Sequence, residues 1–310
     1  MKHGVVIKST GSWFTVKYDT EIVHCKIRGK FRLKGMKATN PLAVGDYVHF
    51  EIQADGTGII TELLDRKNYI IRKSTNLSKQ VHIIASNIDQ CIVVAGMLMP
   101  ETPLEFIDRI LVTAEIYKIP AVIIFNKSDL FTPELLEYTR EIEAEYIKIG
   151  YNCIETSAKT GHNLDKVATL LKDKVSLLSG NSGVGKSTLI NSIDSNLNLK
   201  TGKISDAHLT GKHTTTFAEM FFLEQGGAII DTPGLRGFGV VDLNAEDLSG
   251  NFPEFFNKSE NCQYNNCTHT HEPKCAIKNA VDSGDIAWWR YRSYVSMLEG
   301  DTKHRLDDYE

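Results

Sequence analysis

The sequence lacks a long apolar run and an apolar leader. No stretch of its 310 residues approaches the ~18 consecutive apolar residues of a membrane span, and its start, MKHGVVIKSTG, contains no signal-peptide core. Proline is scarce, with 8 residues, and 42% apolar and 24% charged residues describe a folded chain rather than a disordered or fibrous one. We therefore expect a folded, cytoplasmic protein with no membrane partner.

The net charge is also small, at −4, but the charges are unevenly distributed. Residues 1–73 hold 13 Lys and Arg against 7 Asp and Glu, whereas the remaining residues hold 22 against 32. A chain of this length usually forms two or three domains. We expect a basic module at residues 1–72, a central module at 73–245 and a third at 246–310.

The first module alternates apolar and polar residues in short runs broken by turns, as in GVVIKSTGSWFTVKYD and EIVHCKIRG. This pattern predicts an all-β, OB-like barrel. Basic residues surround one connection and suit a nucleic-acid surface: Lys26, Arg28, Lys30, Arg32, Lys34 and Lys37. An SH3-like barrel with a solvated basic loop is the alternative.

The central module alternates apolar runs with helical patterns, which predicts an α/β domain with a parallel sheet. GNSGVGKS at 180–187 fits the P-loop pattern G-x-x-x-x-G-K-[ST] and stands between the apolar run VSLLS and the helical STLINSI. Backbone N–H groups of such a loop surround phosphates, its lysine reaches the β- and γ-phosphates, and its last hydroxyl ligates Mg²⁺. The predicted contacts are Gly180, Asn181, Ser182, Gly183, Val184, Gly185, Lys186, Ser187 and Thr188.

Two further motifs point to guanine as the base. NKSD follows the run AVIIF and SAK follows NCIET, so both would lie at the carboxyl ends of strands, where parallel sheets bind ligands. The Asp129 carboxylate can accept from both guanine N1–H and N2–H₂, a pair that adenine lacks, and a backbone N–H near Ala158 can meet O6. The predicted contacts are Asn126, Lys127, Ser128, Asp129, Ser157, Ala158 and Lys159. Ordinary turn chemistry is the alternative for either motif alone.

DTPG closes the run GAIID, where Asp231 would hold Mg²⁺ through water and the Gly234 N–H would meet the γ-phosphate. The stretch HTTT supplies hydroxyls for the metal and the γ-phosphate. We favour Thr215 as the switch threonine that ligates Mg²⁺ beside Ser187, with Thr214 as the next choice.

The order of these motifs is unusual. GTPases ordinarily run P-loop, switch threonine, DxxG, NKxD and SAK, but here NKSD and SAK come first, which indicates a circularly permuted domain. Leu235 follows DTPG, where many GTPases have a glutamine that orients the attacking water. We therefore expect slow intrinsic hydrolysis with His213, Thr215 and Lys186 as catalytic residues. A mobile surface histidine is the alternative for His213.

Cysteine is sparse as well, with six residues, of which Cys262, Cys267 and Cys275 lie with His269 in one short segment. The uneven spacing argues against a disulfide scaffold. Three thiolates and one imidazole form a complete tetrahedral ligand set for one structural Zn²⁺, which would stabilise a small module with few large apolar residues. A disulfide, or His271 in place of His269, is the alternative.

The helical segment that follows interleaves aromatic and basic side chains: Trp288, Trp289, Arg290, Tyr291, Arg292 and Tyr294. We expect the aromatic side chains to pack and the arginines to reach phosphate or a protein partner.

Together these motifs resemble the ribosome small subunit-dependent GTPase A family (RsgA, also called YjeQ or EngC) over nearly the whole chain. The resemblance rests on the barrel, the permuted order, GNSGVGKS, GKHTTT, DTPG with Leu235, and the spacing CxxxxCxHxxEPxC. It implies a GTPase that binds the immature 30S subunit and its 16S rRNA near the decoding region, is stimulated by that subunit, and helps release assembly factors. We expect a monomer that binds GTP and GDP.

Some members of that family carry a basic extension before the barrel, whereas the β pattern here begins by Gly4, so the barrel loop would supply more of the RNA contact. Two other functions remain open from the sequence. One is a GTPase acting on another RNA such as tRNA, and the other is a GTP-sensing RNA-binding module with negligible turnover.

Overall fold

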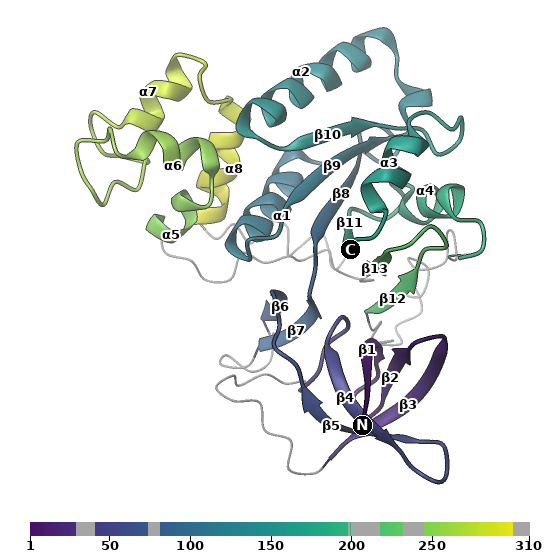
Figure 1. Cartoon of the computed structure of the whole chain (residues 1–310). Coiled ribbons are helices and arrows are strands. Elements are labelled where there is room, and N and C mark those ends of the chain that lie inside the picture. Colours follow the sequence, from purple (N-terminus) through teal and green to yellow (C-terminus); the bar gives the residue numbers. More distant parts are fainter. Residues whose placement is uncertain (29–40, 74–80, 198, 200–217, 232–244, 300–310) are drawn as a thin grey trace, which may run out of the picture.

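The computed structural model describes residues 1–28, 41–73, 81–197, 199, 218–231 and 245–299 (Figure 1). It confirms the predicted fold class: a β-barrel, a central α/β domain and a small helical module follow one another along the chain. Figure 1 shows the barrel below the central sheet and the C-terminal helices beside α1 (Leu104–Ile116). The domain limits at 72/73 and 245/246 stay predictions.

Five short strands form the barrel, in the order β1-β2-β3-β5-β4 with β4 returning to β1. They are β1 (Lys2–Ser9), β2 (Phe14–Tyr18), β3 (Glu21–Ile27), β4 (Tyr47–Ile52) and β5 (Gly58–Leu63). The alternation seen in the sequence places Phe14, Val16 and Tyr18 in the core, and Thr15 and Lys17 outside it. The parallel pairing of β3 with β5 and the closure of β4 on β1 identify an OB-like barrel and exclude the SH3-like alternative.

The barrel is joined to the central domain at two places. Strand β1 extends past β4 and pairs at Lys8 with Glu219 in β12 (Glu219–Phe222), where the two side chains also form an ion pair of 3.1 Å. The second joint is the fully buried Asp46 carboxylate, which accepts two hydrogen bonds of 2.6 Å from Arg66 and one of 2.6 Å from Ser86. Because an ion pair of this geometry is expensive to separate, the barrel is held against the linker hairpin β6 (Tyr69–Lys73) and β7 (Val81–Ser86).

The central sheet has the order β10-β9-β8-β11-β13-β12, and only β12 is antiparallel to its neighbour in the sheet. The parallel strands are β8 (Gln90–Gly96), β9 (Ala121–Asn126), β10 (Asn152–Glu155), β11 (Val175–Ser179) and β13 (Ala228–Asp231). Helices α1 and α2 (Pro133–Ile149) cover one face, and α3 (Leu164–Leu171) and α4 (Lys186–Ile193) cover the other. Burial on both faces explains why β8 is a continuous apolar run in the sequence.

Four short helices build the C-terminal module: α5 (Ala245–Gly250), α6 (Pro253–Ser259), α7 (Ala276–Asp282) and α8 (Trp288–Leu298). Its core of Phe252, Phe255 and Tyr294 also contains Val112 of α1, so the module packs directly on the central domain. Trp289 packs against Tyr146 with ring centroids 5.0 Å apart, as the sequence predicted for the aromatic residues. Trp288 is the exception, because 64% of it is exposed. No helix among the described residues is long and apolar enough to cross a membrane.

The expectation that Arg290 reaches an external phosphate or partner is wrong. Its side chain has no solvent exposure and donates to Asp108 of α1 at 2.6 Å and to Glu254 of α6 at 2.7 and 3.1 Å. Tyr146 of α2 donates to the same Asp108 oxygen at 2.9 Å. Burial raises the pKa of Asp108, and the adjacent guanidinium opposes that rise. Arg290 therefore joins the central domain to the C-terminal module, while Arg292 remains exposed.

Replacing Arg290 by Met should destabilise the protein by about 3–5 kcal/mol, because it leaves two carboxylates buried without a counter-charge. Urea unfolding followed by tryptophan fluorescence measures the loss. The matched control is Lys258→Met, which removes an exposed pair of 3.3 Å with Asp285 and should cost under about 1 kcal/mol. Equal losses in the two variants would contradict the structural role given to Arg290.

Candidate functional site

Four loops meet at the carboxyl edge of the parallel sheet. Strand β9 leads into 126–129, β10 into 157–159, β11 into 180–187, and β13 ends at Asp231. In a sheet of this kind that edge is where ligands bind. The structure thus brings together the described parts of all the motifs that the sequence predicted for nucleotide binding.

The loop at 180–187 adopts a conformation that requires its glycines. Gly180 has φ 141° and Gly185 has φ 96°, and a Cβ on either would lie 2.2 Å from the Val94 carbonyl or 2.5 Å from the Asn126 amide nitrogen. The loop curls around the Lys186 ammonium, which donates to the carbonyls of Gly180 at 2.6 Å and Asn181 at 2.8 Å. Of the remaining predicted loop contacts, Val184 is buried, whereas Ser182, Gly183 and Thr188 are exposed.

Asn126 connects three of the four loops. Its amide nitrogen donates to the Val184 carbonyl at 2.9 Å, and its amide oxygen accepts from Thr156 Oγ1 at 3.2 Å and from the Ala158 N–H at 3.4 Å. The residue is 1% exposed, so water does not compete for these bonds. Every hydrogen-bonding group of the amide that the P-loop and the SAK loop need is thereby supplied by one side chain.

The other NKSD side chains are also held in place. Lys127 has φ 69° and donates from Nζ to the Gly183 carbonyl at 2.7 Å and to the Met99 carbonyl. Asp129 accepts from Ser157 Oγ at 2.6 Å and lies 3.8 Å from the Lys159 ammonium. The Asp129 carboxylate is therefore fixed at the mouth of the site by the loop that follows β10. Ser128 lies nearby and contacts His162 at 3.3 Å.

Two of the predicted Mg²⁺ ligands lie on neighbouring segments. Ser187 is in the first turn of α4, and Asp231 ends β13, where it pairs with Leu178 of β11 just before the P-loop. Thr214, Thr215, His213, Gly234 and Leu235 lie outside the described residues.

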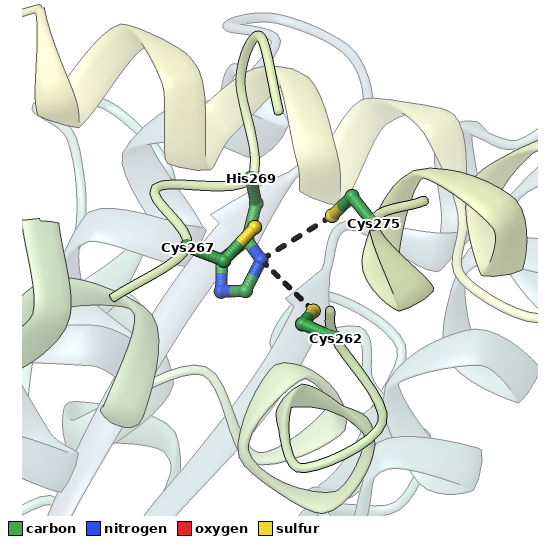
Figure 2. A group of neighbouring side chains, drawn as sticks. All are labelled: Cys262, Cys267, His269 and Cys275. Atoms are coloured by element: carbon green, nitrogen blue, oxygen red, sulfur yellow. Dashed lines mark hydrogen bonds between the residues drawn. The ribbon is translucent and has the colours of Figure 1, made fainter. Parts of the chain in front are cut away.

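The predicted cysteine and histidine cluster is assembled in the C-terminal module, as Figure 2 shows. The ligand atoms of Cys262, Cys267, His269 and Cys275 all lie within 4.8 Å of one another. His269 Nδ1 lies 3.4 Å from Cys275 Sγ and 3.7 Å from Cys262 Sγ. Burial lowers the pKa of His269, which keeps the imidazole neutral, and raises the pKa of Cys267 to about 12, so metal binding must displace its proton. These residues could hold a tetrahedral metal ion.

The alternatives for this cluster are not supported. All six cysteines are free, and the exposed His271 points its Nδ1 to Thr270 at 3.0 Å instead of joining the cluster. Tyr291 and Tyr294 of α8 donate to the carbonyls of His269 and Thr268, both at 2.7 Å, which fixes the ligand loop on the helix.

On the barrel, Lys26 and Arg28 are exposed at the end of β3, while Lys30, Arg32, Lys34 and Lys37 lie outside the described residues. Sequence reasoning missed Trp13, which precedes β2 and is 38% exposed. Lys26 Nζ lies 4.3 Å from the centroid of its ring. The signal was available, since a tryptophan directly after a turn and opposite a basic strand end is unusual in a solvated loop.

Comparisons with known proteins agree with this architecture. The RsgA GTPase family matches residues 63–241, and the RsgA N-terminal domain matches residues 3–60. The chain is 51% identical over 312 residues, covering 99% of both chains, to the small ribosomal subunit biogenesis GTPase RsgA of Christiangramia forsetii. It is 52% identical over 297 residues, covering 96% of both, to the protein of that name from Bacteroides fragilis.

Solved structures are similar too. YjeQ from Thermotoga maritima has a TM-score of 0.78 and 36% identity, covering 96% of this chain and 98% of its own. YloQ, described as a circularly permuted GTPase, has a TM-score of 0.72 and 29% identity, covering 100% and 96%. The permuted motif order in the sequence and the strand order in the sheet have the same explanation: this chain belongs to the RsgA GTPase family.

Proposed function

We propose that this protein hydrolyses GTP in the cytoplasm as a monomer and assists the late maturation of the small ribosomal subunit. The observation that carries the proposal is the junction at Asn126, which joins NKSD, SAK and the P-loop into one site in permuted order. Relatives named small ribosomal subunit biogenesis GTPases share about half of its residues over the whole chain, which supports the partner.

Guanine would be read by the residues that the Asn126 junction positions. Asp129 accepts from the two guanine donors, the Ala158 N–H meets O6, and the Lys127 stem covers the ring. The P-loop N–H groups and Lys186 bind the phosphates. Mg²⁺ would be held by Ser187, Thr215 and Asp231, a hydroxyl and carboxylate set that suits a hard cation, and would supply charge neutralisation at the phosphates.

Hydrolysis is slow on this proposal because Leu235 cannot orient the attacking water. His213 would position that water when the ribosomal subunit is bound, and the Gly234 N–H would contact the γ-phosphate. The nucleotide state then sets affinity for the subunit, and release of assembly factors follows from that change.

The barrel would contact 16S rRNA. Lys26 and Arg28 supply phosphate contacts, and Trp13, which is exposed beside Lys26, supplies a ring on which an unpaired base can stack. Strands β2 and β3 and the β1–β2 loop are the surface that OB folds use for nucleic acids. The basic residues at 30–37 extend the same charge along the sequence.

The function is tested by GTP and ATP turnover of the zinc-loaded protein with and without purified 30S subunits, at fixed salt and Mg²⁺. GTP turnover should rise about tenfold or more with 30S, and ATP turnover should not. GTP binding without 30S stimulation would instead favour another RNA, such as tRNA. Binding with no turnover under any condition would favour a GTP sensor.

A salt series in the same experiment tests the barrel surface. Each phosphate contact contributes about 0.7–0.9 to the slope of log affinity against log salt, so Lys26→Gln should flatten the slope for 30S by that amount. Lys148→Gln on α2, whose ammonium pairs with Glu145 at 3.4 Å on an exposed face, is the control. An unchanged slope for Lys26→Gln would remove Lys26 from the RNA surface.

Asn126→Ala should weaken GDP binding by about 10- to 100-fold, because it leaves buried partners on two nucleotide loops unsatisfied. Asn196→Ala, which removes an exposed amide bonded to Glu224 at 2.8 Å, should leave the affinity within about twofold. Titration with a fluorescent GDP analogue measures both. A similar affinity in the two variants would show that the junction does not organise the site.

For the metal centre we propose one structural Zn²⁺. The spacings of 3.4 and 3.7 Å from His269 Nδ1 match the edges of about 3.5 Å that Zn–S and Zn–N bonds of ~2.3 and ~2.0 Å produce. Cys267→Ser should lose the metal and lower the melting temperature, whereas His271→Ala should keep one Zn²⁺ per chain. Elemental analysis of both proteins decides the matter, and loss of zinc from His271→Ala would reassign the ligand.

A further inference from the structure

We propose that residues 97–102, the loop between β8 and α1, form a further wall of the guanine site by fixing the Lys127 side chain, with Thr102 as the positioning residue. The inference rests on the proposed guanine site and adds to it a segment that none of the nucleotide motifs contains.

The loop is closed by Thr102. Its hydroxyl accepts from the Gly96 N–H at 3.0 Å, and its own N–H donates to the Gly96 carbonyl at 2.7 Å. Thr102 is 2% exposed, so these bonds are protected from water. Gly96 is the last residue of β8 and pairs with Asn126 across the sheet, which places the base of the loop beside the NKSD segment.

The loop then lies against the P-loop through Pro100. A Cβ on Gly96 would lie 2.6 Å from the Pro100 carbonyl oxygen, and a Cβ on Gly183 would lie 3.3 Å from Pro100 Cδ. Pro100 therefore occupies the space between the end of β8 and the P-loop, where glycine at both positions allows the close approach. Closure at Thr102 is what holds Pro100 there.

The ammonium of Lys127 is the third contact. It donates to the Met99 carbonyl as well as to Gly183, so it bridges the 97–102 loop and the P-loop. Its Cε would lie 3.8 Å from a Cβ on Gly185, which shows that the stem runs along the P-loop. Met99 itself is 70% exposed and has φ 48°, a conformation that non-glycine residues rarely adopt and that concentrates at ligand sites.

The physical consequence is preorganisation. A free lysine side chain has high rotamer entropy, which a bound purine would have to remove in order to stack on the stem. Here the backbone of Lys127 is fixed at one end and its ammonium is held by two carbonyls at the other. The entropy is lost on folding rather than on binding, which favours nucleotide affinity.

Thr102→Val tests this without changing the volume of the buried side chain. It removes the hydroxyl that accepts from Gly96, and we expect GDP binding to weaken about fivefold. Thr102→Ser restores the hydroxyl and should return the affinity to within about twofold. The matched control is Thr113→Val in α1, a threonine that is 3% exposed and bonded to the Arg109 carbonyl at 2.8 Å, away from the site.

The decisive readout is a double-mutant cycle with Lys127→Ala, measured by fluorescent GDP titration. If Thr102 acts through Lys127, Thr102→Val should change the affinity of Lys127→Ala by less than about 1.5-fold. A full fivefold loss in that background, or an equal loss from Thr113→Val, would overturn the inference. A silent Thr102→Val with a weakened Lys127→Ala would overturn it alone, whereas a Lys127→Ala that binds GDP normally would overturn the guanine site as well.

Discussion

The nucleotide site depends on one buried amide, that of Asn126. An amide can donate and accept at once, and here it donates to the P-loop while accepting from the segment around the SAK motif. The two loops are 58 and 32 residues away along the chain in the direction of the C-terminus. The geometry of the site is therefore set by a side chain at the end of β9 rather than by the order in which the loops are connected.

This explains how a permuted chain keeps its site. Strand β11, which carries the P-loop, comes late in the sequence yet lies in the middle of the sheet, between β8 and β13. Parallel pairing puts the carboxyl ends of these strands at one edge regardless of chain order, and Asn126 then fixes their loops to one another. What permutation does change is the exit of the chain, since β13 now leads toward the C-terminal module instead of back into the sheet.

The parts that the sequence predicted are those whose physical requirement is local. Gly180 and Gly185 need positive φ, the spacing of Cys262, Cys267, His269 and Cys275 suits four ligands, and the alternation around Val16 needs a barrel core. The parts that were missed depend on distant partners. Arg290 reads as a surface residue in an aromatic-rich helix because Asp108 and Glu254 lie 182 and 36 residues away. Likewise, no local pattern links Lys127 to Met99 or Asp46 to Arg66.

Helix α1 shows what these distant contacts achieve together. It begins after the loop that holds Lys127, and at its second turn Asp108 pairs with Arg290 of α8, whose tyrosines hold the metal-ligand loop. One stiff element thus runs from the base-binding side of the site to the C-terminal module. Because Lys127 is already fixed without nucleotide, base binding has little to change along α1, and this route sets the placement of the module during folding. A signal that distinguishes GTP from GDP must then enter where the γ-phosphate would lie, through the chain that leaves Asp231, which is the connection that the permutation created.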